Sequence, residues 1–294
     1  CGDTAVGDFT VMGTEVTHTG TAQGYRRLVL HYAHLAKAVG GVDGFIIGSE
    51  LRGLTQLRDE TNAFPFVQAL VTLAGEVRGL LRPAAKLTYG ADWTEYFGYH
   101  PQHGSGDVYF HLDPLWASPA IDAVGIDNYM PLSDWRDADL LAENPDGART
   151  ADDPVSLKAA VASGEGFDWY YASDADRKAR LRSPITDGLA AKPWVFRYKD
   201  IHGWWSNRHY DRIGGAEAGT PTAWLAGMKP VWLTELGCPA IDKGANQPNV
   251  FVDPKSSESF APYFSNWMRL DSMQRRFLEA HHDHWTGADA PAGM

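Results

Sequence analysis

Hydrophobic residues follow two different spacings along this chain. Apolar side chains recur every three or four positions over residues 24–39 and 66–81, which predicts two amphipathic helices. A third helix is expected over residues 271–285, with Asp271 or Ser272 as its N-cap. Short, nearly continuous apolar runs predict four strands, at residues 42–47, 86–90, 121–129 and 230–234.

The alternation of strands and helices is typical of βαβ units and predicts a parallel sheet. Because (β/α)8 barrels gather their chemistry at the carboxyl ends of the strands, polar residues at those positions favour a TIM barrel. The polar residues that end the predicted strands are Glu50, Asp92, Asp127 with Asn128 and Tyr129, and Glu235. A doubly wound sheet is the alternative, although the glycine-rich phosphate loop that usually accompanies it does not occur in the sequence.

We expect the barrel to be incomplete at both ends. Few residues precede the strand before Glu50, and nothing after Trp285 reads as a closing strand. Residues 132–228 form a long polar and aromatic stretch before the strand of Glu235, which is far more than a βα connection needs, and they are interpreted as an insertion. The chain, residues 1–294, is treated as a single barrel domain. It begins with Cys1 rather than Met, so we expect an excerpt or a processed piece of a longer chain.

Composition excludes several classes of function. The 294 residues are 44% hydrophobic and 12% aromatic, enough for a large core, and no apolar stretch approaches the length of a membrane helix. Net charge is -11, and no Lys/Arg run is interleaved with aromatics, so neither a nucleic acid partner nor membrane insertion is expected. Two cysteines, Cys1 and Cys238, are too few for a disulfide framework, and we interpret Cys238 as a small packed residue.

Glu50 and Glu235 end two matching apolar runs, "GFIIGSEL" and "KPVWLTELG". Retaining glycosidases use two carboxyl groups about 5 to 5.5 Å apart, one as acid/base and one as nucleophile, and facing barrel strands can provide that separation. A single strand-end Glu is more often a salt-bridge or capping residue. Two of them on matching motifs favour a catalytic pair.

Further residues are candidates for sugar binding. Indole rings are platforms for the apolar faces of sugars, and Trp93 is the strongest candidate because it follows a strand end directly, whereas Trp204 and Trp205 are weaker ones. The polar residues Asp92, Asp127 and Asn128 either bind sugar hydroxyls or satisfy loop backbone groups.

The run "HHDHW" at residues 281–285 raises the question of a metal site. On a helix, His281 and His284 share one face with few other ligand types nearby, so a solvated helix end is the preferred interpretation. Neither a metal nor a cofactor is expected.

Several motifs resemble known families. "IIGSELRGL" followed by "WLTELG" is similar to the clan A glycoside hydrolases, especially the β-mannanase-like branch. "ADWTEYFGYHPQHGSGDVYFHLDPLWASPAIDAVGIDNYMPLSDWRD" and "TELGCPAIDKGANQPNVFVDPKSSES" resemble the TIM-barrel-like domain of gene transfer agent and phage tail proteins, over roughly residues 25–285. The resemblance implies that Glu50, ending the fourth strand, is the acid/base and that Glu235, ending the seventh, is the nucleophile. It also implies that Tyr129 ends the sixth strand, where its hydroxyl orients Glu235.

One position departs from the clan pattern, because Ser49 stands where many clan A enzymes carry an Asn that holds the sugar 2-hydroxyl. The resemblance implies retaining hydrolysis of a bacterial envelope glycan, a polysaccharide or peptidoglycan-type polymer. A non-catalytic glycan-binding or structural module is the alternative. The resemblance further implies that the domain lies at the tail tip of a virion or gene transfer agent. The protein would be made in the cytoplasm and act at the bacterial cell surface beside other tail or baseplate proteins.

Overall fold

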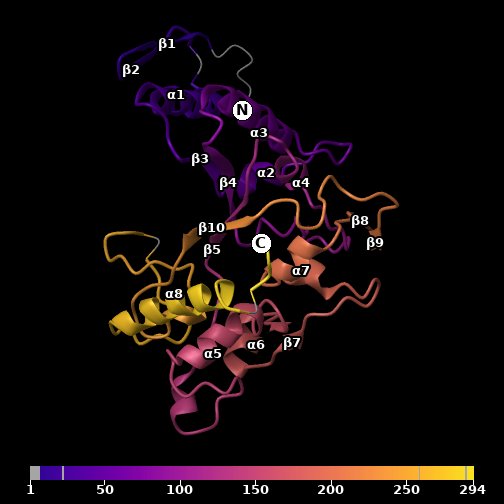
Figure 1. The fold of residues 1–294 in the computed structure, drawn as a ribbon. Helices are drawn as coiled ribbons and strands as arrows, with labels where there is room; N and C mark the ends of the chain where they lie inside the picture. The colour runs from indigo at the N-terminus through magenta and orange to yellow at the C-terminus, as the bar shows by residue number, and fades with distance from the viewer. Residues whose placement is uncertain (1–6, 22, 258, 289) are drawn as a thin grey trace. The chain divides into compact units, whose positions relative to one another are not determined.

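The computed structural model describes residues 7–21, 23–257, 259–288 and 290–294 and contains a four-stranded sheet (Figure 1). Its order is β10-β5-β4-β3, with parallel pairing of β3 with β4 and of β4 with β5. The strands are β3 (Gly44–Ser49), β4 (Lys86–Asp92), β5 (Val124–Asn128) and β10 (Val231–Leu236). Each lies where the apolar runs predict a strand, so the expected α/β architecture with a parallel sheet is confirmed.

Two helices cover this sheet near its β3 edge. Helix α3 (Pro65–Leu80) packs against β3, and α1 (Tyr25–Ala38) packs against α3. Pro65 opens α3 at a position where the missing N–H costs nothing, and the helix buries apolar residues three or four positions apart along one face. These two helices occupy nearly the predicted residues.

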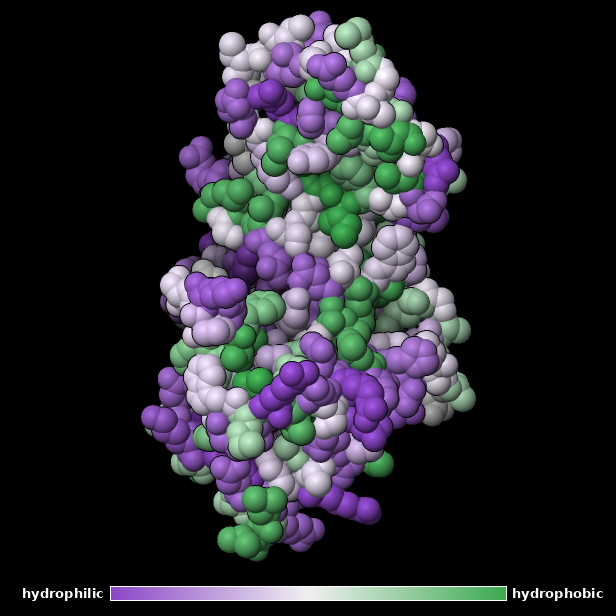
Figure 2. Space-filling view, turned by 90° about the vertical axis from the view of Figure 1, so that its left-hand side faces the viewer, coloured by the Kyte–Doolittle hydropathy of each residue, from purple (hydrophilic) through white to green (hydrophobic). Residues whose placement is uncertain are grey.

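The buried face of α1 differs from the expected one. Val29 and Ala33 are buried, but Leu28 is 53% exposed and Tyr32 55% exposed, although both belong to the predicted apolar stripe. The strands at the edges of the sheet expose apolar side chains as well, with Ile46 of β3 49% exposed. Figure 2 shows hydrophobic side chains gathered on the surface near the N-terminal part of the chain. Among the described residues, nothing covers these apolar groups.

The chain divides into two compact units. The first comprises residues 1–127 and 207–234, and the second comprises residues 128–206 and 235–294, so β5 and β10 each continue from one unit into the other. Besides the elements above, the first unit contains the hairpin β1 (Phe9–Met12) and β2 (Glu15–His18), α2 (Arg52–Thr55), α4 (Asp113–Trp116), and the strand pair β8 (Arg212–Ile213) and β9 (Ala216–Glu217). The single-domain interpretation and the boundaries of the insertion remain predictions.

The second unit is built on α5 (Pro154–Ala159) and α8 (Asp271–Trp285), which pack together. Their apolar faces enclose Leu157, Met273 and Phe277. The expected N-cap of α8 is wrong, because Leu270 occupies that position without a side-chain cap and Asp271 is already helical. Short elements complete the unit: η1 (Asp137–Leu140), η2 (Ala160–Ala162), β6 (Trp169–Tyr170), α6 (Asp174–Ala179), β7 (Ser183–Pro184), η3 (Pro193–Phe196), α7 (Ile201–Ser206) and η4 (Gly244–Asn246).

The buried carboxylate of Asp134 binds side chains from several parts of residues 134–182, a segment of the second unit with few regular elements. Asp134 accepts hydrogen bonds from Tyr171, Arg180 and Arg182. Burial by itself would raise the pKa of Asp134, but the hydroxyl of Tyr171 and the arginine charges outweigh it and lower that pKa. The ionised carboxylate therefore fixes three distant parts of a segment that has little regular backbone pairing.

Cys238 and the run "HHDHW" both lie in the second unit. Cys238 is buried and burial raises the pKa of its thiol to about 12, as expected for a small packed residue, while Cys1 lies outside the described residues. The solvated-end interpretation of "HHDHW" holds for the exposed His282 but is wrong for His281, which is buried and accepts a hydrogen bond from Trp285. No helix within the described residues has the length and apolarity to cross a membrane.

Candidate active site

Glu50 is the first residue after β3 and has an unusual backbone. Its φ is 51°, in the left-handed region that only glycine adopts without strain. Its backbone N–H nevertheless donates to the carbonyl of Gly90 at 2.9 Å, which pins the strained residue to β4. Strain held in place in this way is concentrated at functional sites.

The strand that precedes Glu50, β3, is irregular near its end. The register between β3 and β4 shifts between Ile46 and Ser49, and the Tyr25 hydroxyl donates to the Ile47 carbonyl at 2.6 Å. A Cβ on Gly48 would lie 2.3 Å from that hydroxyl, so only glycine fits here. The bulge therefore sets the direction of Ser49 and Glu50.

The loop after Glu50 rests on a buried carboxyl group. The Leu51 N–H donates to the Tyr89 hydroxyl at 2.8 Å, and that hydroxyl lies 3.2 Å from both oxygens of Glu95. Glu95 also accepts from Thr55, and burial raises its pKa to about 7. Sequence reasoning missed Glu95, and its place among the aromatics of "DWTEYF" was the available signal.

Asp127 lies in the middle of the sheet and is 1% exposed. Its Oδ2 accepts from the Ser49 hydroxyl and its Oδ1 from the Thr234 hydroxyl, both at 2.6 Å. A Cβ on Gly90 would lie 3.0 Å from either oxygen, so that glycine leaves room for the carboxylate. Ser49, the residue that replaces the clan A Asn, thus has its hydroxyl committed to Asp127.

Glu235 is an exposed residue of β10, the strand next to β5. Its Oε2 accepts a hydrogen bond from the Tyr129 hydroxyl at 2.6 Å, and the Tyr129 ring makes an edge contact with Phe251. The predicted hydrogen bond from Tyr129 is therefore present. It fixes one oxygen of Glu235 and leaves the other open to a ligand.

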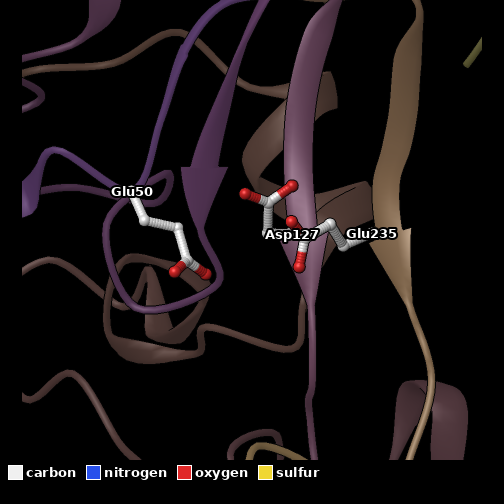
Figure 3. Close-up of side chains that lie close together, drawn as sticks. All are labelled: Glu50, Asp127 and Glu235. Atoms are coloured by element: carbon white, nitrogen blue, oxygen red, sulfur yellow. The ribbon is translucent and has the colours of Figure 1, made fainter.

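Glu50, Asp127 and Glu235 form a carboxylate cluster at the ends of β3, β5 and β10 (Figure 3). Oxygens of the three groups lie within 4.8 Å of one another. This proximity matches the predicted closeness of Glu50 and Glu235 and approaches the roughly 5 Å separation of a retaining pair. Such spacing would also let the oxygens share a divalent cation, but exposed acidic groups gather without one as well.

The remaining predicted sugar-binding residues are two polar residues and three tryptophans. Asp92 accepts from the Thr94 N–H at 2.7 Å and Asn128 from the Met130 N–H at 3.0 Å, so both satisfy loop backbone groups. Trp93 is partly exposed. Trp204 is fully buried in α7, so its ring is a core element and its expected role as a sugar platform is wrong, while Trp205 stays partly exposed.

Comparison with known proteins identifies the family of the chain. No curated protein matches the chain. The family model described as "GTA TIM-barrel-like domain" matches residues 23–293, which include all three carboxylates of the cluster. The match covers more than nine tenths of the sequence, and with the parallel α/β sheet it establishes that this chain belongs to the gene transfer agent (GTA) TIM-barrel-like domain family.

Proposed function

We propose that this domain hydrolyses a β-linked glycan of the bacterial envelope with retention of configuration, through Glu50 and Glu235. The observation that carries the proposal is the approach of their carboxylate oxygens to within 4.8 Å at strand ends. A scaffold has no use for two exposed carboxylates held against electrostatic repulsion. The hydrogen bond from Tyr129 supports the assignment of Glu235, because it orients one oxygen and leaves the other for attack.

The proposed reaction is a double displacement. Glu235 attacks the anomeric carbon and forms a glycosyl ester, while Glu50 protonates the departing glycosidic oxygen. Glu50 then removes a proton from water, which attacks the same carbon and releases Glu235. The buried carboxyl group of Asp127 accepts hydrogen bonds from Ser49 and Thr234, which hold it in place beside the pair.

A non-catalytic glycan-binding module is the second candidate. The observation in its favour concerns Ser49, whose hydroxyl donates to Asp127. A hydroxyl engaged in this way does not hold the sugar 2-hydroxyl as the clan A Asn does. Binding without turnover would then be the remaining use of the cluster.

We also propose how the domain completes a barrel and where it lies in the particle. The four-stranded sheet represents half of a (β/α)8 barrel, with the residues near 132–228 inserted between the sixth and seventh strands. Support comes from the family match and from the exposed apolar side chains of α1 and β3. In this proposal the domain acts at the cell surface from the tail tip of a gene transfer agent or phage, beside other tail or baseplate proteins.

The test compares Glu235→Gln and Glu50→Gln on the full chain with Glu60→Gln, an exposed control outside the cluster. Glu235→Gln should abolish release of reducing ends from purified envelope glycans while glycan binding persists, because an amide cannot form the ester. Glu50→Gln should slow substrates with poor leaving groups most, since those need the proton.

If the wild-type chain binds envelope glycan but releases no reducing ends over days, the hydrolase proposal fails. Binding that is then lost in Glu50→Gln and Glu235→Gln but kept in Glu60→Gln would identify the cluster as a binding site without turnover.

A further inference from the structure

Helix α2 is the single turn that follows Glu50, and one buried carboxyl group is linked to both of its ends. That group belongs to Glu95, which is 0% exposed, as are its partners Tyr89 and Thr55. At the end of α2, the Thr55 hydroxyl donates to Oε1 of Glu95. At its start, the Leu51 N–H donates to the Tyr89 hydroxyl at 2.8 Å, and that hydroxyl lies 3.2 Å from both oxygens of Glu95. The carboxyl group therefore binds one end of the turn directly and the other through a tyrosine.

A third side-chain link joins α2 to the turn that carries Glu95. The Arg52 guanidinium donates to the Thr94 hydroxyl at 2.6 Å. Thr94 in turn donates to the Asp92 carboxylate, both from its hydroxyl and from its N–H. The Glu95 N–H donates to the Asp92 carbonyl at 2.7 Å, which closes the turn at the end of β4. Helix α2 thus rests on a turn whose own shape is fixed.

The backbone of Glu50 needs support from both sides because its φ of 51° is strained. A strained residue persists only where the surrounding structure holds it. Its own N–H is held by the Gly90 carbonyl at 2.9 Å. The next N–H, that of Leu51, is held by the Tyr89 hydroxyl. This second bond is made by a side chain, so its geometry depends on Glu95, which fixes the hydroxyl from the other side.

A carboxylate suits this place because its partners are hydrogen-bond donors. It accepts from the hydroxyls of Thr55 and Tyr89 and, at 3.3 Å, from the N–H of Asp92. Burial raises the pKa of Glu95 to about 7, although these hydrogen bonds oppose the shift. Strongly shifted carboxyl groups of this kind are concentrated at functional sites.

We propose that Glu95 and Tyr89 are positioning residues for Glu50, which hold its backbone in the conformation that brings its carboxyl group to the carboxylate cluster. Their part in hydrolysis rests on the proposed function, in which Glu50 is the acid/base. Neither residue touches the sugar in this scheme. Their effect reaches the reaction through Leu51 and the strained residue before it.

The first test is structural and does not depend on activity. Tyr89→Phe, made in the full chain, removes the hydroxyl that binds the Leu51 N–H. In its crystal structure Glu50 should leave the left-handed region, and its carboxyl group should move away from the other two carboxylates of the cluster. If Tyr89→Phe does not fold, Thr55→Val takes its place, because it removes the direct bond from α2 to Glu95. Thr55→Ser keeps that hydroxyl and should keep the conformation of Glu50.

The second test uses the leaving group as a readout of Glu50 alone. The probes are the phenyl and 2,4-dinitrophenyl β-glycosides of glucose, mannose and N-acetylglucosamine. In Tyr89→Phe, kcat/KM for the phenyl glycoside should fall at least about tenfold, because phenol is a poor leaving group that needs the proton. For the dinitrophenyl glycoside, which needs no proton, kcat/KM should change less than about threefold.

Tyr109→Phe is the matched control for both tests. It also removes a hydrogen bond from a phenol to a carboxylate, that of Tyr109 to Asp107 at 3.1 Å, in the same unit but away from α2. It should change neither the conformation of Glu50 nor the dependence on the leaving group. A loss of stability alone would lower kcat/KM for both glycosides by the same factor.

The assignment is overturned if Glu50 keeps its φ and its place in the crystal structure of the folded variant. It is also overturned if kcat/KM falls equally for the two leaving groups, or if Thr55→Ser displaces Glu50 as much as Thr55→Val does. If the wild-type chain hydrolyses none of the glycosides and no envelope glycan, the proposed function fails. The crystal structures then still decide whether Tyr89 and Glu95 hold Glu50 in the cluster.

Discussion

Tyr129 contacts Glu235 of the carboxylate cluster through a hydroxyl that can be removed while the ring is kept. Tyr129→Phe keeps the ring and its edge contact with Phe251 but deletes the 2.6 Å hydrogen bond to Glu235. A hydrogen bond to a charged group contributes about 1.5–3 kcal/mol, so we expect hydrolysis to slow about 10- to 100-fold. The melting temperature should fall only slightly, because the bond is exposed to solvent. Steady-state kinetics and thermal melts check this. An unchanged rate would mean that Tyr129 does not orient the nucleophile.

Glu95 predicts a specific pH dependence of stability. Its pKa is raised from 4.5 to about 7 by burial, so between these values the folded chain holds a proton that the unfolded chain has lost. Its contribution to the free energy of unfolding is therefore largest below pH 4.5 and falls by about 3 kcal/mol as the pH rises through 7.

The neutral Glu95→Gln variant lacks this dependence. Urea unfolding of both proteins at pH 5 and pH 8 should show the variant gaining stability relative to the wild type at the higher pH. Parallel changes in the two proteins would contradict the raised pKa of Glu95.

Sequence reasoning identified residues at strand ends but not those whose role depends on burial. Glu50, Glu235 and Tyr129 directly follow or end apolar runs, and adjacency to a strand end is visible in a sequence. Glu95 is defined by the groups packed around it from distant segments, and no local pattern reports those. Trp204 was misread for the same reason, since its polar neighbours in sequence do not reveal a buried ring.

At the scale of elements, the bulge in β3 predicts how one methyl group added at Gly48 changes stability and activity. In Gly48→Ala the new Cβ would lie 2.3 Å from the Tyr25 hydroxyl, so either the hydroxyl leaves the Ile47 carbonyl or the strand shifts and takes Glu50 with it. We expect a loss of about 1–3 kcal/mol in unfolding free energy and reduced hydrolysis.

The matched control is Gly79→Ala in α3, where a Cβ meets nothing within 4 Å. It should be neutral or stabilising, because alanine favours helix more than glycine does. Adding Tyr25→Phe to Gly48→Ala removes the clashing hydroxyl and should restore part of the lost stability. If the double variant is no more stable than Gly48→Ala, the clash is not the cause.

Elements were predicted where the apolar pattern is strong. The four sheet strands and helices α1, α3 and α8 lie at or near the predicted residues because long apolar runs and helical spacing are local properties. The β1–β2 hairpin was missed, since its four-residue strands are mostly exposed and have no apolar face to read. The prediction of the buried face of α1 was only half right. Spacing shows which residues share a face but not which neighbours cover it.

At the scale of the whole molecule, the family and the parallel sheet were accessible from sequence, whereas the division into two compact units was not. Extended motifs such as "IIGSELRGL" identify a fold through resemblance even where elements are short. The grouping of residues 128–206 with 235–294 depends on contacts such as α5 against α8, which join segments far apart in the chain. Periodicity within a short window carries no information about such contacts.

The net charge predicts how the domain approaches an envelope. At -11 the chain is repelled by anionic surface polymers, and this repulsion acts over roughly 30 Å at 0.01 M salt but only 8 Å at 0.15 M. Association with intact, negatively charged envelope should therefore strengthen as salt rises across this range. Binding of a neutral oligosaccharide released from the envelope glycan should stay constant, because hydrogen bonds and apolar packing are not screened. Sedimentation with envelope fragments and calorimetry with the free sugar measure the two. If envelope binding instead weakens with salt, a local attraction between opposite charges dominates, and recognition does not rest on neutral sugar units.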